Sequence, residues 1–386
     1  PRKKGEEAND HHDSHERQAR LIQHKPLING NRELHGGRLR HSLARAAKSA
    51  ADCGGPASIA RYIAMTVSSG HWYPILSSRE LKKNPISRTR FGQRVVIWRD
   101  VAGQAVVLED RCPHRGAALS QGRVRDGAIE CPFHGFRYDA AGRCVLVPAE
   151  GDDWQIPAHL RVTAYSVRED AGYVWLWRGP KVAAAALPPL PRQPILDGLI
   201  FGETHYIWNA HYTRCIENVI DYSHLPFVHR KNLGAFIKNP ATQVLVKPFT
   251  GGFNFYLADR DDFERQFVEF VYPTLWANRI GKRFVMAATF VPVDDAHTDV
   301  YVRWYHKLPG LVRPLVDLYG QFSQYIVFND DLPIVASQQP SSVDDANIDK
   351  LVPSDAALVA FRKLRRAHQD EIQSHIDDQA AIRSVS

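Results

Sequence analysis

Short runs of β-branched and aromatic residues alternate with turn residues between about residues 70 and 180. The runs read RVVIW at 94–98, QAVVL at 104–108 and GYVWLW at 172–177, with Gly and Asp between them. Runs of this kind, broken by short turns, are typical of strands joined by tight loops. We therefore predict a small antiparallel β domain in this part of the chain.

The second half of the chain mixes strand-like and helix-like segments. Strand-like runs stand at 253–257, 265–272, 283–293 and 299–308, and helix-like stretches at about 213–229, 311–339 and 354–376. Strands followed by helices favour an α+β fold over a doubly wound parallel sheet. A proline-containing segment at 181–194 is typical of a linker or strap between domains. The predicted division is a basic N-terminal extension at 1–65, a β domain at 66–182 and an α+β domain at 183–386.

Composition narrows the class of protein without naming an activity. Hydrophobic residues make up 44% and charged residues 24% of the 386 residues, which is ordinary for a soluble globular protein. We expect no membrane span, because no apolar run nears about 20 residues, and no secretory signal, because the N-terminus is charged. Five scattered cysteines indicate a reducing compartment, so we predict a cytoplasmic location. The formal net charge of +7 suits either nucleic acid or an acidic electron carrier as a partner.

Two cysteines and two histidines stand in matching pairs within the predicted β domain. Cys112 and His114 are two positions apart in DRCPHRGAALSQG, and Cys131 and His134 are three apart in ECPFHGFRYD. Two thiolates and two imidazoles are the ligands of a [2Fe–2S] cluster in which His replaces Cys on one iron. Structural zinc also takes two Cys and two His, although zinc fingers usually group the cysteines together and the histidines together on a helix. Unrelated Cys and His residues that fall close by chance are the remaining alternative.

These two segments resemble the Rieske signature, C-x-H followed after a spacer by C-x-x-H, with its flanking glycines and Pro-containing loops. The resemblance covers about residues 70–180 and implies a Rieske [2Fe–2S] domain. It also implies the cluster ligands, which are Cys112, His114, Cys131 and His134. The other cysteines, at positions 53, 144 and 215, have no counterpart in the signature and are expected to be ordinary thiols.

A second group of candidate ligands lies in and beyond the segment ENVIDYSHLPFVH. His224 and His229 are five apart, a little more than one helical turn, and can converge on one ion if the helix loosens near Pro226. Two histidines and one carboxylate with open positions suit ferrous iron and O2. Asp330 and Asp331, adjacent within an apolar helical run, are the candidates for the carboxylate.

This half of the chain resembles the catalytic domain of Rieske non-haem iron oxygenases, a helix-grip α+β fold in which helices flank an antiparallel sheet. The family writes its site as N-x-x-D-x-x-H-x-x-x-x-H, and Asn218, Asp221, His224 and His229 stand in that register without gaps. The whole resemblance spans about residues 70–370. It leaves only the N-terminal extension outside.

The third iron ligand is also implied by the resemblance. The family pattern is an acidic pair with a Gln seven positions after the second acid, and Gln338 stands at that offset from Asp331. Asp331 is therefore the expected ligand, and Asp330 is the alternative. Asn218 and Asp221 are the candidate catalytic residues beside the iron.

The resemblance further implies a terminal oxygenase in which Fe(II) activates O2 with electrons that come from NAD(P)H through a ferredoxin or ferredoxin reductase. In the family these electrons pass between neighbouring subunits of a ring-shaped homotrimer. An aspartate at the Asp221 position bridges a cluster histidine of one subunit (here His134) and an iron histidine of the next (here His224). Arg115 and Arg137, beside the cluster ligands, are candidates for docking the acidic electron carrier.

Weaker signals bear on the reaction type. HWYPI at 71–75 and VPSDAALVAFRKLRR at 352–366 resemble the oxygenases that monooxygenate or demethylate, such as vanillate and dicamba O-demethylases and the pheophorbide oxygenase type. We predict monooxygenation, as hydroxylation or oxidative demethylation, of an apolar aromatic or polycyclic small molecule, with neither nucleic acid nor a membrane span involved. The alternatives are a ring cis-dihydroxylating dioxygenase, a Rieske electron-transfer protein and a nucleic-acid-binding zinc protein.

The substrate pocket is expected in the strand-rich region 250–306. Its apolar candidates would suit an aromatic substrate, although strands bury such residues in any case. These candidates are Phe253, Phe255, Phe284, Met286, Phe290 and Trp304. His211 is a further candidate to lie near the iron.

Overall fold

The computed structural model describes most of the chain after residue 66. It covers 67–385 apart from 152, 238–242, 258–266, 281–283, 309 and 345–348. The predicted N-terminal extension lies outside the described residues. All described residues belong to one structural unit, Ala60–Ser386.

The first half of this unit, which we call the β half, consists of three small antiparallel sheets. The sheets have the orders β1-β10-β9, β2-β3-β4 and β5-β6-β7-β8. The strands are β1 (His71–Ser77), β2 (Ile86–Arg90), β3 (Gln93–Arg99), β4 (Ala105–Glu109), β5 (Arg123–Arg125), β6 (Ala128–Glu130), β7 (Arg137–Tyr138), β8 (Cys144–Leu146), β9 (Val167–Asp170) and β10 (Tyr173–Arg178). The predicted β domain is therefore confirmed.

Alternate residues of β3 face two different cores. Val95 and Ile97 belong to the large core that includes the second half of the unit, whereas Val96 and Trp98 belong to a smaller core that also contains both candidate cysteine ligands. Successive side chains of a strand point to opposite faces, so the fully buried run VVIW serves both cores at once. The loops that carry the cysteines are thereby attached to a strand that is packed on the rest of the molecule.

The second half, which we call the α+β half, is built on one seven-stranded antiparallel sheet of order β11-β17-β16-β15-β14-β13-β12. Its strands are β11 (Ile200–Trp208), β12 (Val244–Phe249), β13 (Gly252–Leu257), β14 (Val268–Val271), β15 (Leu275–Ile280), β16 (Phe284–Pro292) and β17 (Thr298–His306). Every residue of β17 is buried. The predicted α+β fold, with an antiparallel sheet and helices, is confirmed.

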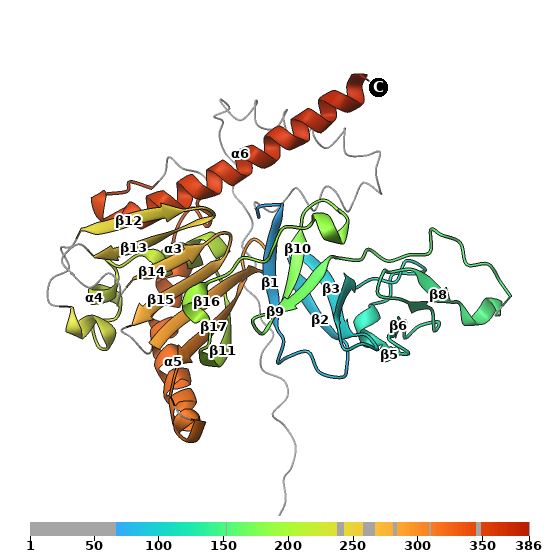
Figure 1. Ribbon diagram of the computed structural model, residues 1–386, viewed down its shortest axis with the longest axis horizontal. Helices are drawn as coiled ribbons and strands as arrows, with labels where there is room; N and C mark the ends of the chain where they lie inside the picture. The colour runs from blue at the N-terminus through green and yellow to red at the C-terminus, as the bar shows by residue number, and fades with distance from the viewer. Residues whose placement is uncertain are drawn as a thin grey trace, which may run out of the picture. The chain divides into compact units, whose positions relative to one another are not determined.

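Four helices accompany this sheet: α3 (Tyr212–Ile220), α4 (Leu225–Val228), α5 (Arg313–Ser337) and α6 (Ala356–Val385). α3 contacts β16, α5 runs along the edge strand β11, and α6 crosses β12 and β13 (Figure 1). Short 3-10 helices complete the connections, at η2 (Leu119–Gln121), η3 (Pro148–Glu150), η4 (Ala184–Ala186), η5 (Pro194–Leu196), η6 (Leu233–Phe236), η7 (Gly310–Val312) and η8 (Pro353–Asp355). None of the helices in the described part is long and apolar enough to cross a membrane.

The helix predicted over 213–229 is broken in the structure. α3 ends at Ile220, Asp221 takes an extended backbone conformation as its C-cap, and α4 begins only at Leu225. The break therefore lies before His224 rather than near Pro226, which stands in the first turn of α4, where proline is tolerated. His224 and His229 therefore flank a separate short helix, as the N-cap and C-cap of α4, instead of continuing α3.

A buried arginine joins the two halves. Arg303 on β17 is 0% exposed and donates to the carbonyls of Ala171 and Gly172 at 2.6 and 2.7 Å. These two residues form the β9–β10 turn and have positive φ values of 51° and 73°, as a two-residue type I′ hairpin requires. Glu203 on β11 neutralises the guanidinium at 2.6 Å. The hairpin of the β half is thus held against β17, the strand next to the edge strand β11 of the large sheet.

Candidate metal centres

Two loops of the same build carry the Cys/His pairs. In one, Gly116 N–H donates to the Cys112 carbonyl and Cys112 N–H donates to the Ala117 carbonyl, both at 2.8 Å. In the other, Gly135 N–H donates to the Cys131 carbonyl at 3.1 Å, and Cys131 N–H donates to the carbonyl five residues further on at 2.7 Å. Both glycines have positive φ, 79° and 72°, which closes each loop tightly without strain.

The four candidate cluster ligands meet where these loops face one another. The rings of His114 and His134 lie 4.7 Å apart, and Cys112 and Cys131 are each 2% exposed. Burial raises the pKa of the Cys131 thiol, and the neighbouring Cys112 adds to this. His134 Nδ1 is buried without a hydrogen-bond partner. Thiolates that are buried need a nearby positive charge, and an imidazole nitrogen without a hydrogen-bond partner can bind a metal. This set of donor atoms therefore fits a [2Fe–2S] cluster.

A tyrosine lies against one of the two thiols. Tyr138 Oη is 3.2 Å from Cys112 Sγ. Burial raises the pKa of Tyr138 far above its ordinary value, so the hydroxyl keeps its proton and can donate to a thiolate. The sequence places Tyr138 seven residues after Cys131, in ECPFHGFRYD, but its role was not predicted.

Three side chains from different elements converge in the α+β half. His229 Nε2 lies 3.0 Å and His224 Nε2 3.6 Å from Asp331 Oδ1. The two histidines flank α4, and Asp331 comes from the inward face of α5. Each of the three residues offers one possible ligand atom for a metal ion, and these atoms all lie within 4.8 Å of one another.

The environment of this triad fits a metal ion. The side chain of His229 is 0% exposed, that of Asp331 5% and that of His224 14%. His229 Nε2 and Asp331 Oδ1 are buried and, although they lie 3.0 Å apart, neither atom makes a hydrogen bond. Buried polar atoms are costly without a partner. Two imidazoles and one carboxylate suit ferrous iron with open positions.

Each histidine of the triad has a carboxylate on its other ring nitrogen. His224 Nδ1 lies 3.4 Å from Asp221 Oδ2, and His229 Nδ1 lies 3.4 Å from Asp330 Oδ2. Burial alone would lower the pKa of His229, but Asp331 and Asp330 raise it. Burial likewise opposes ionisation of Asp221, yet His224 lowers the pKa of this carboxyl. A carboxylate on the outer nitrogen fixes the tautomer and orientation of a metal-binding imidazole.

Asp330 therefore lies behind His229, on the side away from Asp331. Its Oδ2 also accepts a hydrogen bond from Asn232 Nδ2 at 2.9 Å. Sequence reasoning considered Asp330 only as an alternative ligand and did not foresee this contact. The only sign of this contact in the sequence was that the two acids are adjacent. Neighbouring residues on a helix point in different directions, so Asp330 and Asp331 were not expected to face the same atom.

The other predicted site residues have separate places. Asn218 stands on α3, one turn before Asp221, with its Nδ2 buried and unpartnered. His211 is the N-cap of α3, where its ring accepts from the Thr213 N–H, and it is not part of the triad. Burial lowers the pKa of His211 to about 4, so it is neutral.

A buried ion network holds α3 in place. Glu217 accepts from Arg214 at 2.9 Å and from Arg362 of α6 at 2.6 Å, and both arginines also pair with Asp349. Paired and hydrogen-bonded charges can be buried at acceptable cost. The helix that leads into Asp221 is therefore attached to α6 and to the segment after α5.

The two candidate docking arginines differ. Arg137 is engaged by Glu130 at 2.9 Å and by Asp126 at 3.4 Å, so its charge is largely neutralised. Arg115 is exposed and lies over the ring of Phe133, which is itself 56% exposed. Of the two, Arg115 offers the freer charge at the cluster loops.

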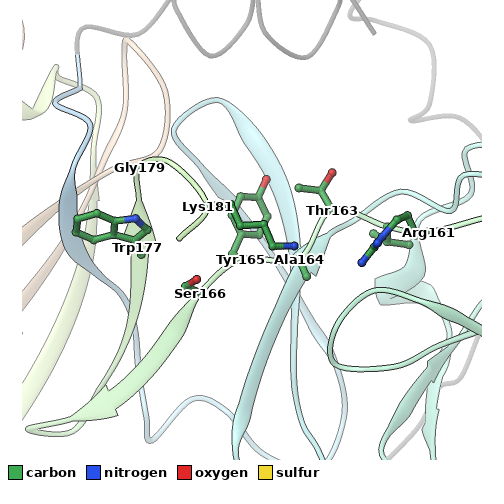
Figure 2. A pocket seen from close by; sticks show the side chains of 9 residues that line it. Arg161, Thr163, Ala164, Tyr165, Ser166, Trp177, Gly179 and Lys181 are labelled. Atoms are coloured by element: carbon green, nitrogen blue, oxygen red, sulfur yellow. The ribbon is translucent and has the colours of Figure 1, made fainter. Parts of the chain in front are cut away.

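The predicted pocket residues lie mainly in the core. Phe253, Phe255 and Phe290 are at most 3% exposed, and Trp304 donates to Asp317 on α5 at 3.0 Å. An apolar groove of about 730 Å³ lies between β12, β13 and α6, and Phe253 is among its lining residues. A second cleft, of about 390 Å³, lies in the β half beside Tyr165 (Figure 2). Neither cavity is lined by a residue of the two candidate centres.

Fold and sites together define a protein that combines a cluster-binding β domain with a mononuclear metal centre. The Rieske [2Fe-2S] domain family matches residues 71–165, and the vanillate O-demethylase oxygenase C-terminal domain family matches residues 208–371. The chain therefore contains a Rieske [2Fe-2S] domain and a vanillate O-demethylase-type oxygenase C-terminal domain, the two domains of the Rieske terminal oxygenase group. These two domains imply a Rieske cluster and a mononuclear iron as cofactors.

Individual relatives agree with this assignment. The chain is 32% identical over 256 residues to the 3-chlorobenzoate-3,4-dioxygenase oxygenase subunit of Comamonas testosteroni, covering 61% of this chain and 58% of that protein. It is 28% identical over 343 residues to the methylxanthine N3-demethylase NdmB of Pseudomonas putida, covering 81% and 92%. The structure of dicamba monooxygenase bound to dicamba has the same fold, with a TM-score of 0.66 and 20% identity over 80% of this chain and 100% of that one. The matched region spans only about half the length of several curated relatives, between 45% and 58%.

Proposed function

We propose that this chain is a terminal oxygenase that takes electrons from a reductase and monooxygenates an apolar aromatic or polycyclic small molecule, by hydroxylation or oxidative demethylation. The observation that supports this most is the convergence of His224, His229 and Asp331 in a chain that also carries the two Cys/His loops. A Rieske protein that only transferred electrons would not need such a triad. A zinc protein that binds nucleic acid could use the two Cys/His loops but would not need the triad.

The proposed roles follow from the donor atoms of each site. The cluster ligands are Cys112, His114, Cys131 and His134, and the iron ligands are His224, His229 and Asp331. Iron held by two imidazoles and one carboxylate supplies open coordination positions for O2 chemistry. The protein's part is to present Nε2 of both histidines toward Asp331, which Asp221 and Asp330 do from the opposite ring nitrogens. Asn218, close to Asp221 in the chain, adds an unpaired buried amide near this site.

Monooxygenation is supported by what the relatives are called. One is a methylxanthine N3-demethylase, another a 4beta-methylsterol monooxygenase, and the dicamba enzyme is a monooxygenase. The name of the 3-chlorobenzoate-3,4-dioxygenase subunit favours the second candidate, ring cis-dihydroxylation. Turnover of a panel of methoxylated and chlorinated aromatic compounds under 18O2 separates the two. Hydroxylation leaves one labelled oxygen atom in the aromatic product and demethylation leaves none, because the label departs with formaldehyde, whereas cis-dihydroxylation leaves two on the ring.

The assembly and the electron donor are part of the same proposal. Asp221 is 25% exposed and already faces His224, so a cluster histidine of a neighbouring subunit, its His134, could reach the other side of this carboxylate in a head-to-tail homotrimer. The exposed Arg115 suits an acidic ferredoxin or NAD(P)H-dependent reductase. A cytoplasmic location fits the buried free thiols.

The deciding experiment is iron quantitation with low-temperature EPR on protein purified without oxygen. We expect about three irons per chain and an anisotropic [2Fe–2S] signal after reduction. Asp331→Ala should lower the iron content toward two and leave the cluster signal intact, while Asn329→Ala, at an exposed position on the same helix, should change neither. Protein that contains zinc and gives no EPR signal would contradict the proposal, and two irons in the unsubstituted protein would leave only an electron carrier.

A further inference from the structure

The outward face of α5 carries a row of large apolar side chains that the described chain leaves exposed. We call this row the α5 stripe. Its members are Leu311, which lies just before the helix and is 92% exposed, Leu315 (70%), Leu318 (65%), Tyr319 (72%), Phe322 (64%) and Tyr325 (59%). Leucines and aromatic residues are rarely so exposed in contiguous groups unless the surface binds something.

The spacing of the stripe is that of a helix–helix contact. Positions 311, 315, 318, 322 and 325 follow one another at alternating steps of four and three residues. This spacing is the a/d repeat by which two helices pack side by side. Tyr319 lies next to this row on the same face of the helix.

Packing within the protomer does not account for the stripe. The opposite face of α5 carries the buried residues Gly320, Gln324, Phe328, Asp331 and Val335, and it contacts the edge strand β11. The helix is therefore already anchored on one side. Its other side contributes nothing to the core of the described unit.

The area of the stripe is sufficient for a stable interface. At roughly 150 Å² of exposed surface for each large side chain, six residues offer on the order of 900 Å² per copy. Pairing two such faces would remove more than about 1,000 Å² in total, the size at which specific interfaces begin. The face can therefore support a protein contact without help from other surfaces.

The charge pattern indicates the occupant. Between Pro314 and Asn329 the only charged residue is Asp317, and it accepts a hydrogen bond from Trp304 on the inward side. Helices that lie on membrane surfaces carry many Lys and Arg on their polar faces, and docking to a charged partner needs charges of the opposite sign. A neutral apolar face is complementary to itself, which suits a second copy of the same chain.

We propose that the α5 stripe is a homotypic interface, in which α5 packs against α5 of a second copy across a twofold axis. This contact is isologous, whereas a head-to-tail ring uses two different surfaces. The two kinds of contact are therefore compatible. Where both form, the α5 contacts join two rings face to face and double the mass of one ring.

The test measures the mass of the purified full-length protein by light scattering after size exclusion, over a range of concentrations. The variant combines Leu318→Glu and Phe322→Glu, which place two charges on the stripe at positions that are 65% and 64% exposed. We expect its mass to be half that of the unsubstituted protein. Val101→Glu, at a position in the β half that is 81% exposed, is the matched control and should keep the full mass. Unchanged far-ultraviolet circular dichroism and visible absorption show that both variants fold.

Any of four outcomes would overturn the proposal. The double variant could keep the full mass, or the unsubstituted protein could already be a monomer or a single ring. A fall to one third of the mass would place the stripe within a ring contact and would also contradict twofold pairing. Loss of binding to phosphatidylcholine vesicles at unchanged mass would assign the stripe to a lipid surface. Because mass is measured without O2 chemistry, these results are independent of the proposed activity.

Discussion

Replacing Tyr138 by Phe should lower the midpoint reduction potential of the Rieske cluster. Tyr138 Oη lies 3.2 Å from Cys112 Sγ, and burial keeps the hydroxyl protonated, so it is the donor. Reduction adds negative charge to the cluster and its thiolates. A hydrogen bond donated to a more negative sulfur is stronger, so the hydroxyl favours the reduced form.

The size of this effect follows from the strength of one hydrogen bond. A buried bond of this kind contributes about 1 to 1.5 kcal/mol. If most of this energy distinguishes the two redox states, its loss lowers the midpoint by about 40 to 65 mV, since a tenfold change in a one-electron equilibrium is about 59 mV. Phenylalanine retains the ring of Tyr138, which is 0% exposed, so the fold of the loops should not change.

The assay is a potentiometric titration followed by visible circular dichroism. Tyr165→Phe is the matched control, because its hydroxyl donates to Gln93 Oε1 at 2.8 Å and not to a cysteine. Its midpoint should equal that of the unsubstituted protein. A Tyr138→Phe midpoint that does not move, or an equal shift in both variants, would refute the reasoning.

Three further changes test other contacts. Asp330→Asn should weaken iron binding by about 10- to 100-fold, because His229 loses the carboxylate that orients it, and an unchanged affinity in a chelator competition would contradict that role. Arg303→Met should lower the free energy of unfolding by about 3 to 5 kcal/mol, since it leaves a buried carboxylate unpaired, and a urea titration measures this. Burial opposes ionisation of Asp299, but its ion-pair partners on β11 and β2 hold its pKa below the ordinary value. Its stabilising effect is therefore present above the unfolded-state pKa of about 3.9 and is lost as pH falls through the lower folded-state pKa. Asp299→Asn should remove that acid-side loss from a stability–pH profile, and an unaltered profile would be inconsistent with the pairing.

The features that sequence reasoning captured are local. The Cys/His pairs are short segments between strands, and the run VVIW shows that both faces of β3 are buried. Period-two and turn signals were therefore enough for the α+β fold. The break in the helix at Asp221 was placed too late, because the only breaker visible in the sequence was Pro226, and a proline in the first turn starts a helix rather than ending one.

The choice between Asp330 and Asp331 needed the resemblance to a family, although the helix contains a second signal. Gln324, Phe328, Asp331 and Val335 are spaced by four, three and four residues, so they share the buried face of α5, whereas Asp330 does not. The buried face can be identified from the sequence only if the α5 stripe is recognised as a separate, outward face of the same helix. In the first half of α5 the buried residues are Gly320 and Gln324, whereas the large apolar residues lie on the outward face, so the sequence alone does not show which face of the helix points inward.

The structure removes this ambiguity through close packing far from the iron site. A Cβ atom at Gly320 would lie 2.5 Å from the ring of Trp304, and one at Gly202 would lie 2.2 Å from the indole nitrogen of the same residue. Only glycine at both positions allows α5 to approach β11 and β17 closely enough for Trp304 to donate to Asp317. Asp331 is three turns further along the same helix, so this contact contributes to its placement opposite the two histidines. The third candidate ligand is thus positioned by long-range packing. The family pattern around Asp330 and Asp331 can single out the residue, but it does not show what holds it opposite the two histidines.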